Sequence, residues 1–330
     1  MGSHLSCVLL NIMTENKILN IFLRWFGLVF IFFGVTAYAA EFVVLGDMPY
    51  GSEVEVDEAY QNLILQINRQ NADFVVHLGD IKSGSTLCSD EVYARQMTLL
   101  SIFVAPLIYT PGDNEWTDCH RKNNGGYDPL ERLQKLRQIF FDSTYFEGNS
   151  VLGLQSQGKV DADFSDFVEN QMWIASKTLF LSIHVVGSNN NMDAGTREGE
   201  REFILRESAN SRWIKQAFDQ LKGDRISDLV VVFHGDPFID WMMPEPSLMY
   251  AGFSQTIGSV LFGLAQKTDK NVLIINGDTH KYRWDQPFHF NGSLLSNVSR
   301  LVVPGARDMR AVKISIQRAQ DNYYSIEMIE

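Results

Sequence analysis

One arrangement recurs along most of this chain: a short apolar run, a loop that often carries Gly-Asp, and then an amphipathic stretch with helical periodicity. The apolar runs cover residues 41–45, 74–78, 106–110, 180–186, 229–233 and 272–275. Alternation of strands and helices favours βαβ units, and continuous apolarity is typical of strands that are buried on both faces. The sequence therefore predicts an α/β fold around a buried sheet.

Helical patterns fill the gaps between these runs. They cover residues 57–69, 89–102, 129–140, 200–221 and 253–268. Beyond Lys281 the helical patterns stop and short apolar runs follow at residues 301–303, 311–316 and 323–328. We expect these last runs to form an antiparallel flank of the fold.

The N-terminal segment differs in character from the rest of the chain. Lys17 and Arg24 precede an apolar run at residues 25–35, and an Ala-Tyr-Ala tripeptide ending at Ala39 matches the small-x-small pattern that signal peptidases recognise. The apolar run is short for a membrane span. We therefore predict that residues 1–39 are a signal peptide, and a retained N-terminal anchor is the alternative.

Residues 40–330 contain no linker, repeat or low-complexity tract, so we predict that they form a single domain. Cleavage of the leader would leave a periplasmic or secreted protein with no stable membrane anchor. The sequence makes no prediction about the oligomeric state of that protein.

The charge balance argues against a nucleic-acid-binding surface. The chain has 28 Lys and Arg residues against 40 Asp and Glu residues, a formal net charge of −12. Binding to a phosphate backbone requires a stripe of basic side chains, which this sequence lacks. A site that handles a phosphate group would need positive charge of its own, and bound metal is one source.

Cys88 and Cys119 are the two cysteines that remain after cleavage of the leader. An even pair in an oxidising compartment predicts a disulfide. Two free buried thiols are one alternative, and a zinc site that includes His120 is another.

Acidic and histidine side chains stand where the predicted strands end. They are Asp47, Asp80, Asp113, His234, Asp278 and His280. Any one of these acids could be a helix cap or a turn former. Ligands of open α/β sheets bind at the carboxyl ends of the strands, however, so the set as a whole favours a metal site.

The order of these segments resembles that of the calcineurin-like metallophosphoesterases. Their signature runs Asp-x-His, Gly-Asp, Gly-Asn-His-Asp/Glu, His and Gly-His-x-His. The corresponding segments here read Gly46-Asp47-Met48-Pro49, Gly79-Asp80, Gly112-Asp113-Asn114-Glu115, His234-Gly235-Asp236-Pro237 and Gly277-Asp278-Thr279-His280. Each block alone is a weak signal, but five blocks in order cover nearly the whole mature chain.

The resemblance implies a four-layer αββα sandwich of two mixed sheets flanked by helices. It also implies a metal-dependent phosphoester hydrolase, in which a water or hydroxide that bridges two divalent ions attacks phosphorus. Carried onto this sequence, the ligands of the first ion are Asp47, Asp80 and His280. The ligands of the second ion are Asp80, which bridges the two, Asp113, His234 and Asp278.

Four positions depart from the family pattern. Pro49 stands in place of a metal-binding histidine, so the first site loses a donor and the protein could hold one ion instead of two. Asp113 and Asp278 replace an asparagine and a histidine, which favours manganese, magnesium or calcium over zinc, with iron as a further option. Asn114 replaces the histidine that assists protonation of the leaving group, and an amide does not readily donate a proton.

His184 ends one of the apolar runs and is followed by Gly-Ser-Asn-Asn-Asn. It is a candidate for the missing ligand or proton donor, and the alternative is a core histidine bonded to the backbone. With Asn114 and Asp80 it completes the set of candidate catalytic residues.

Two functions remain open at this stage. The first is a metal-dependent phosphoester hydrolase of the cell envelope that acts on a small phosphorylated substrate. The second is a catalytically degenerate module that binds metal or a phosphorylated ligand without turnover. The sequence does not separate monoesters from diesters.

Overall fold

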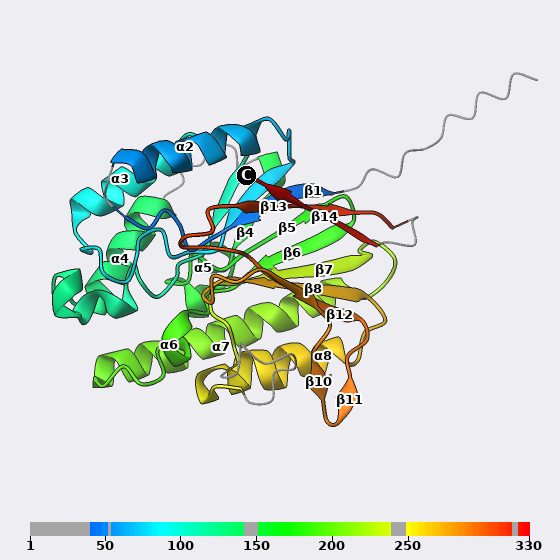
Figure 1. The fold of residues 1–330 in the computed structure, drawn as a ribbon. Coiled ribbons are helices and arrows are strands. Elements are labelled where there is room, and N and C mark those ends of the chain that lie inside the picture. The colour runs from blue at the N-terminus through cyan, green and yellow to red at the C-terminus, as the bar shows by residue number, and fades with distance from the viewer. Residues whose placement is uncertain (1–39, 52–53, 142–150, 239–248, 319–322) are drawn as a thin grey trace, which may run out of the picture. The chain divides into compact units, whose positions relative to one another are not determined.

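The computed structural model describes residues 40–51, 54–141, 151–238, 249–318 and 323–330. Residues Ala39–Glu330 form one compact unit, drawn as a ribbon in Figure 1. The predicted signal peptide at residues 1–39 lies outside the described residues. No helix in the described part of the chain has the length and apolar character that crossing a bilayer requires.

The first sheet has five strands in the order β14-β13-β1-β2-β3. Their bounds are β1 Glu41–Leu45, β2 Phe74–His77, β3 Leu107–Tyr109, β13 Ala311–Ile316 and β14 Tyr324–Ile329. Strands β1, β2 and β3 are parallel, whereas β13 runs antiparallel to β1 and β14 antiparallel to β13. The carboxyl ends of β1, β2 and β3 therefore meet at one edge of this sheet.

The second sheet has seven strands in the order β4-β5-β6-β7-β8-β12-β9. Their bounds are β4 Gln155–Ser156, β5 Gln171–Ala175, β6 Thr178–Ser182, β7 Asp228–Val232, β8 Asn271–Asn276, β9 Arg283–Asp285 and β12 Val298–Val302. A separate hairpin consists of β10 His289–Phe290 and β11 Ser293–Leu294. Strands β6, β7, β8 and β12 are parallel, and β5 and β9 run antiparallel to their neighbours.

The helices form the outer layers. The longer ones are α2 Val54–Asn68, α3 Asp90–Leu100, α4 Pro129–Phe140, α7 Arg197–Gln220, the π-helix η6 Ser254–Leu261 and its continuation α8 Phe262–Ala265. Short turns of helix are η1 Thr117–His120, η2 Lys122–Asn124, α5 Gln157–Val160, η4 Ala162–Phe164, α6 Gly187–Asn190 and η5 Ala251–Phe253. In Figure 1, α2, α3 and α4 lie beside the first sheet, and α7 and α8 lie beside the second.

Three hydrophobic clusters join these layers. In β1, Val43 and Leu45 pack with the helices of the first sheet, whereas Phe42 and Val44 pack against strands of the second sheet. A third cluster packs α7 and η6 on the outer face of the second sheet, with Trp213 among its members. Strand β1 is therefore buried on both faces, between helices and the second sheet. The predicted αββα sandwich of two mixed sheets is confirmed.

Several helix starts follow from capping. Ser89 accepts a hydrogen bond from Val92 N at the start of α3, and Asp128 caps α4, whose first residue is Pro129. Thr196 caps α7 in the same way. Side-chain oxygens at these positions satisfy backbone N–H groups that have no partner within the helix.

Two expectations from the sequence are corrected. Residues 301–303 were expected in the antiparallel flank. Strand β12 instead lies inside the second sheet, parallel to β8 and antiparallel to β9, and among the described strands β13 and β14 form the antiparallel flank of the first sheet. Residues 253–268 do not form one α-helix, because Ser254–Leu261 is a π-helix and Phe262–Ala265 a turn of α-helix. The run at residues 180–186 overlaps β6, but β5 and its hairpin with β6 were not predicted.

Candidate metal centre

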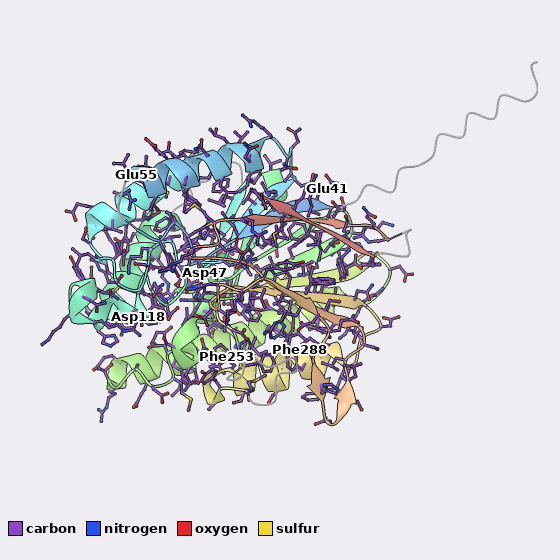
Figure 2. The ribbon with its side chains drawn as sticks, in the orientation of Figure 1. Glu41, Asp47, Glu55, Asp118, Phe253 and Phe288 are labelled. Carbon is purple, nitrogen blue, oxygen red and sulfur yellow. A yellow bond between two sulfur atoms is a disulfide. The ribbon has the colours of Figure 1, made fainter. Side chains whose placement is uncertain are left out.

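The acids and histidines at the strand ends converge in the structure. Asp47, Asp80 and Asp113 follow β1, β2 and β3 of the first sheet. His234 and Asp278 follow β7 and β8 of the second sheet. Asp47 lies inside the unit and is fully buried, in contrast to the exposed Glu55 on α2 (Figure 2). The polar side chains that follow the parallel strands of both sheets therefore lie close together.

A first group of potential ligands consists of Asp47, Asp80 and His280, whose donor atoms lie within 4.8 Å of one another. His280 Nε2 is 3.4 Å from Asp47 Oδ1. Both carboxylate oxygens of Asp47 also accept from the backbone N–H of Asp278, at 3.1 Å. The group therefore joins the end of β1 to the loop after β8.

A second group consists of Asp80, Asp113 and His234, also within 4.8 Å. His234 Nε2 is 3.1 Å from Asp113 Oδ1 and 3.4 Å from Asp80 Oδ1. The other ring nitrogen, Nδ1, lies 2.8 Å from the carbonyl oxygen of Leu78. With a proton on Nδ1 donated to that carbonyl, Nε2 keeps its lone pair for a ligand, as is usual for metal-binding histidines.

Asp278 borders the second group. Its Oδ1 is 3.9 Å from His234 Nε2, and its Oδ2 accepts from the backbone N–H of Asp236 at 3.0 Å. All six predicted metal ligands are therefore found at this centre, and Asp80 is the residue that the two groups share.

The backbone at this centre adopts a conformation that is rare for residues with a side chain. Asp47, Asp80, Asp278 and His280 have φ of 56°, 52°, 71° and 60°. Such left-handed conformations cost of order 1–3 kcal/mol and persist where the surroundings enforce them, often at functional sites. Gly187 has a matching constraint, because a Cβ there would lie 2.8 Å from oxygens of both Asp113 and Asp278.

The electrostatics reflect several carboxylates in a buried space. Burial, together with neighbouring acids, raises the pKa of Asp80 well above its usual range. Burial and the charge of Asp113 raise the pKa of Asp278 to about 7. Burial alone would lower the pKa of His234, but Asp80 and the other acids raise it well above its ordinary value. An excess of buried negative charge with oxygen and imidazole donors fits divalent cations.

Asn114 lies at this centre, as predicted. Its side-chain Nδ2 donates to Asp80 Oδ2 and to the hydroxyl of Tyr50, the latter at 3.1 Å. Its backbone N–H donates to Asp80 Oδ1 at 3.0 Å. The amide therefore orients the shared carboxylate.

Tyr50 was not predicted from the sequence. Its hydroxyl lies 2.7 Å from Asp80 Oδ2 and 3.3 Å from His280 Nε2. The available signal was its position directly after the Gly-Asp-Met-Pro block.

Glu115 is a second residue whose role the sequence did not reveal, although it ends the Gly-Asp-Asn-Glu block. Its Oε1 accepts from the backbone N–H groups of Asp80 and Gly112, at 3.0 and 2.7 Å, and from the Tyr109 hydroxyl at 2.8 Å. The carboxylate thus ties the strand ends after β2 and β3 together beneath the candidate ligands.

A turn of left-handed backbone conformation, on the segment after β6 of the second sheet, contacts the second group of potential ligands. Ser188, Asn189, Asn190 and Asn191 have consecutive φ values of 51°, 55°, 53° and 56°. The buried guanidinium of Arg206 donates to both the carbonyl and the side-chain oxygen of Asn190, which holds the turn in place. As a result the Ser188 hydroxyl donates to Asp113 Oδ2 at 2.9 Å.

His184 lies in the interior, away from both groups. Its ring is fully buried, with Nδ1 2.8 Å from Glu169 Oε1 and its centroid 5.3 Å from that of Trp116. Neither group of potential ligands found among the described residues includes it. Of the two alternatives for His184, this geometry favours the core histidine, with a side-chain partner instead of the backbone.

Replacing Glu169 with glutamine is expected to lower the free energy of unfolding by about 2 to 3 kcal/mol at pH 7, since it removes one partner of a buried ion pair. Glu169 is fully buried and pairs with Arg137 at 2.6 Å. Although burial alone would raise it, Arg137 and His184 hold the pKa of Glu169 well below its usual range.

A lowered carboxyl pKa contributes stability above the unfolded value of about 4.3, and this contribution is lost as the pH falls further. Urea unfolding of both proteins at pH 7 and pH 3.5 checks the prediction. The difference between them should shrink at the lower pH, and a difference that is small at pH 7 or grows in acid would contradict it.

A cavity of about 980 Å³ opens beside the candidate ligands. Asp278, His280, Ser188, Phe238, Tyr250 and Arg307 are among the residues that line it. Cavities of this size accommodate small molecules.

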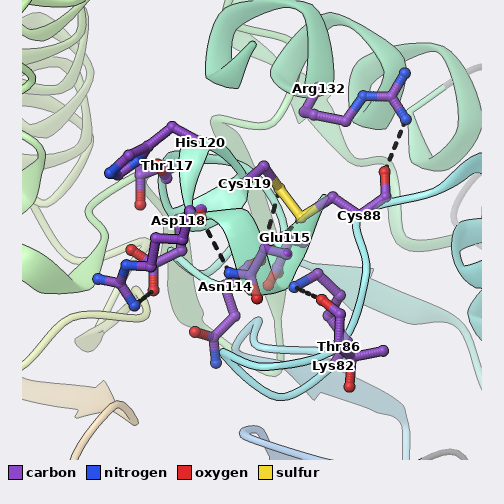
Figure 3. Close-up of a disulfide and its surroundings, with 12 residues drawn as sticks. Lys82, Thr86, Cys88, Asn114, Glu115, Thr117, Asp118, Cys119, His120 and Arg132 are labelled. Atoms are coloured by element: carbon purple, nitrogen blue, oxygen red, sulfur yellow. Dashed lines mark hydrogen bonds and ion pairs between the residues drawn. A yellow bond between two sulfur atoms is a disulfide. The ribbon is translucent and has the colours of Figure 1, made fainter. Parts of the chain in front are cut away.

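Cys88 and Cys119 are joined by a disulfide in the structure, with their Cα atoms 5.8 Å apart. Cys88 lies on the loop after β2, and Cys119 belongs to η1 on the segment after β3. Figure 3 shows the bond beside Asn114 and Glu115. It therefore links the two loops that carry Asp80 and Asp113.

A family model described as calcineurin-like phosphoesterase matches residues 40–282. A comparison with curated proteins found no match. Among solved structures, a dimetal phosphatase from Danio rerio is 12% identical, with 88% of this chain and 98% of that chain covered and a TM-score of 0.51. GAP50, the anchor in the inner membrane complex of Plasmodium, is 11% identical, with 88% and 89% covered and a TM-score of 0.49. Purple acid phosphatase PPD1 from yellow lupin (Lupinus luteus) seeds is 16% identical, with 88% and 51% covered and a TM-score of 0.45.

At these identities, the likeness to the dimetal phosphatase shows the fold and not the activity. The family model, in contrast, spans well over half of the 330 residues and includes every candidate ligand at the strand ends. The resemblance seen in the sequence is confirmed: this chain belongs to the calcineurin-like phosphoesterase family.

Proposed function

We propose that this protein is a metal-dependent phosphoester hydrolase of the cell envelope that acts on a small phosphorylated substrate. The observation that carries the proposal is the pair of ligand groups that share Asp80. Family membership supports hydrolysis of a phosphoester in general. The cavity beside Asp278 and His280 supports a substrate of small size.

Asp47, Asp80 and His280 would hold one divalent ion, and Asp80, Asp113, His234 and Asp278 the other. When bound, such ions lower the pKa of water and neutralise the charge on phosphoryl oxygens. The other residues keep the ligands in place. Glu115 fixes the backbone of Asp80, the Leu78 carbonyl fixes the His234 ring, and Ser188 orients Asp113.

The donor set favours hard cations at the second group. Asp113 and Asp278 add carboxylate oxygens next to a single histidine, His234, which suits manganese, magnesium or calcium better than zinc, with iron as a further option. Pro49 supplies no donor to the first group, so a protein with one ion is the alternative to two.

Export to the periplasm or the medium is part of the proposal. It rests on the leader-like sequence at residues 1–39 and agrees with the disulfide between Cys88 and Cys119. We further propose that residues 40–330 act as one domain.

The competing function is a module that binds metal or a phosphorylated ligand without turnover. The substitutions at Pro49 and Asn114 favour it, because each removes a histidine that the family pattern carries. The discriminating experiment measures the metal content of the exported protein together with its hydrolysis of a panel of aryl phosphates. Turnover that follows metal occupancy supports the hydrolase, whereas full occupancy without turnover supports the binding module.

Asn114 leads to a prediction about leaving groups. Because an amide donates protons poorly, aryl phosphates with acidic phenols should be cleaved readily and alkyl phosphates slowly. Replacing Asn114 with histidine is expected to raise the rate for alkyl phosphates about a hundredfold, at the lower end of what general acids contribute, and to change the rate for acidic phenols little.

Rates for aryl and alkyl phosphates, ranked by the pKa of the leaving group, test this prediction on both proteins. Metal content serves as the control, because Asn114 also bonds to Asp80. A rate that does not depend on the leaving group in the native protein, and is unchanged by the substitution, would mean that no acid is missing at position 114.

A further inference from the structure

We propose that Tyr50 is a positioning residue of the first ligand group, which has Pro49 where the family pattern has a histidine. Its hydroxyl orients Asp80 next to His280 for an ion. The inference rests on the proposed function, since it assigns a role within the same metal centre. It concerns a residue that no motif of the family pattern covers.

The Tyr50 hydroxyl lies at the meeting point of three side chains of the centre. It is 2.7 Å from Asp80 Oδ2, 3.1 Å from Asn114 Nδ2 and 3.3 Å from His280 Nε2. The rings of Tyr50 and His280 also meet edge to face, with centroids 5.3 Å apart.

The hydrogen-bonding capacity of a phenol matches these three neighbours. A tyrosine hydroxyl has one proton to donate and two lone pairs that accept. The proton goes to Asp80 Oδ2, the shortest of the contacts, and one lone pair accepts from the Asn114 amide. The second lone pair lies 3.3 Å from His280 Nε2 and accepts from it when that nitrogen carries a proton.

The local sequence and backbone explain why residue 50, and not residue 49, places a polar atom at the first ligand group. Pro49 has no side-chain donor, and it is followed directly by Tyr50, whose longer side chain reaches the same group. The segment before it is fixed by Asp47 N, which donates to the Gly79 carbonyl at 2.9 Å, and by the buried side chain of Met48. The Tyr50 side chain therefore extends from a segment after β1 whose position is fixed.

The contact with Asp80 matters most because this carboxylate serves both groups. Its Oδ1 accepts from the backbone N–H of Asn114 and lies 3.4 Å from His234, on the side of the second group. Its Oδ2 accepts from Tyr50, on the side of the first group. Tyr50 thus fixes the rotation of the carboxylate that assigns one oxygen to each group.

The test is a calorimetric titration of the metal-depleted, processed protein with Mn²⁺, for the native chain and for Tyr50→Phe. This substitution removes one oxygen and keeps the ring. We expect the Kd of at least one ion to rise about 10- to 100-fold, the effect typical of a lost partner of a metal ligand. A Kd within twofold of the native value for both ions would overturn the inference.

Tyr250→Phe is the matched control. Tyr250 lines the cavity beside the ligand groups, and no hydrogen bond joins its hydroxyl to any of the described ligand residues. We expect this variant to bind Mn²⁺ like the native protein. A loss of affinity as large as that of Tyr50→Phe would mean that any tyrosine hydroxyl near the centre matters, and would also overturn the specific role of Tyr50.

A second measurement separates positioning from direct action on the substrate. With an aryl phosphate, kcat of Tyr50→Phe at saturating Mn²⁺ should return to within a few fold of the native value, because excess ion compensates for weaker binding. A kcat that stays low at saturating Mn²⁺ would contradict the positioning role.

Failure of this inference can be distinguished from failure of the proposed function. A native protein that binds Mn²⁺ but hydrolyses no phosphoester refutes the hydrolase and leaves the titration decisive for Tyr50. A native protein that hydrolyses aryl phosphates, with Tyr50→Phe unchanged in affinity, refutes only the inference.

Discussion

Replacing Asp80 with asparagine is expected to lower kcat/KM for an aryl phosphate by about a thousandfold. The reason is that Asp80 belongs to both ligand groups, so one lost charge weakens the binding of two ions at once. A bound metal contributes several kcal/mol to the stabilisation of charge in the transition state, and about 4 kcal/mol corresponds to a thousandfold in rate. An amide also retains one oxygen, so the loss should be partial and not complete.

Metal stoichiometry after dialysis tests whether Asp80 serves both ions. Asp80→Asn should lose affinity for both ions, whereas His280→Ala should lose affinity mainly for one. Asp219→Asn is the control, because Asp219 is an exposed acid that pairs with Lys222 on the surface. Full metal content and a native rate in Asp80→Asn would show that the residue is not shared.

Removal of the Cys88–Cys119 disulfide is expected to lower the free energy of unfolding by roughly 3 to 4 kcal/mol. The two cysteines are 31 residues apart, and closing a loop of this length restricts the unfolded chain by about that amount in the chain-entropy model. The bond also connects the loops that carry Asp80 and Asp113, so a lower affinity for metal should accompany the loss of stability.

Urea unfolding of the metal-free protein, with and without a reductant, measures the change. The double variant Cys88→Ser and Cys119→Ser should unfold like the reduced protein and should not respond to the reductant. Peptide mapping of the protein from an oxidising compartment is the independent check, and two free thiols there would contradict the prediction.

The sequence predicted many of the strands because the apolar residues within each run indicate that the run is buried. Residues 41–45 coincide with β1, and residues 311–316, which are apolar mainly on one face, coincide with β13. Helix α4 was also predicted in full, since Asp128 and Pro129 mark its start. Within each sheet, the convergence of the strand-end acids follows from the parallel order of the strands, but the meeting of the two sets across the sheets does not.

The features that were missed depend on contacts between distant segments. Strand β12 joins β8 in parallel, which no pattern within residues 298–302 specifies. Tyr50 meets His280 across 230 residues of sequence, and Glu115 acts through backbone groups of another loop. For His184, a position near a strand end was predictable but the direction of its ring was not, because its partner Glu169 lies in an irregular segment.

The candidate ligands come from both sheets: Asp47, Asp80 and Asp113 from the first, and His234 and Asp278 from the second. An ion held among them would therefore link the two sheets. Because anything that binds only the folded state stabilises it by mass action, the cohesion of the two halves would depend on the free concentration of that ion. In a metal-poor compartment the folded state would be less stable, so the supply of metal would affect the stability of the protein as well as its chemistry.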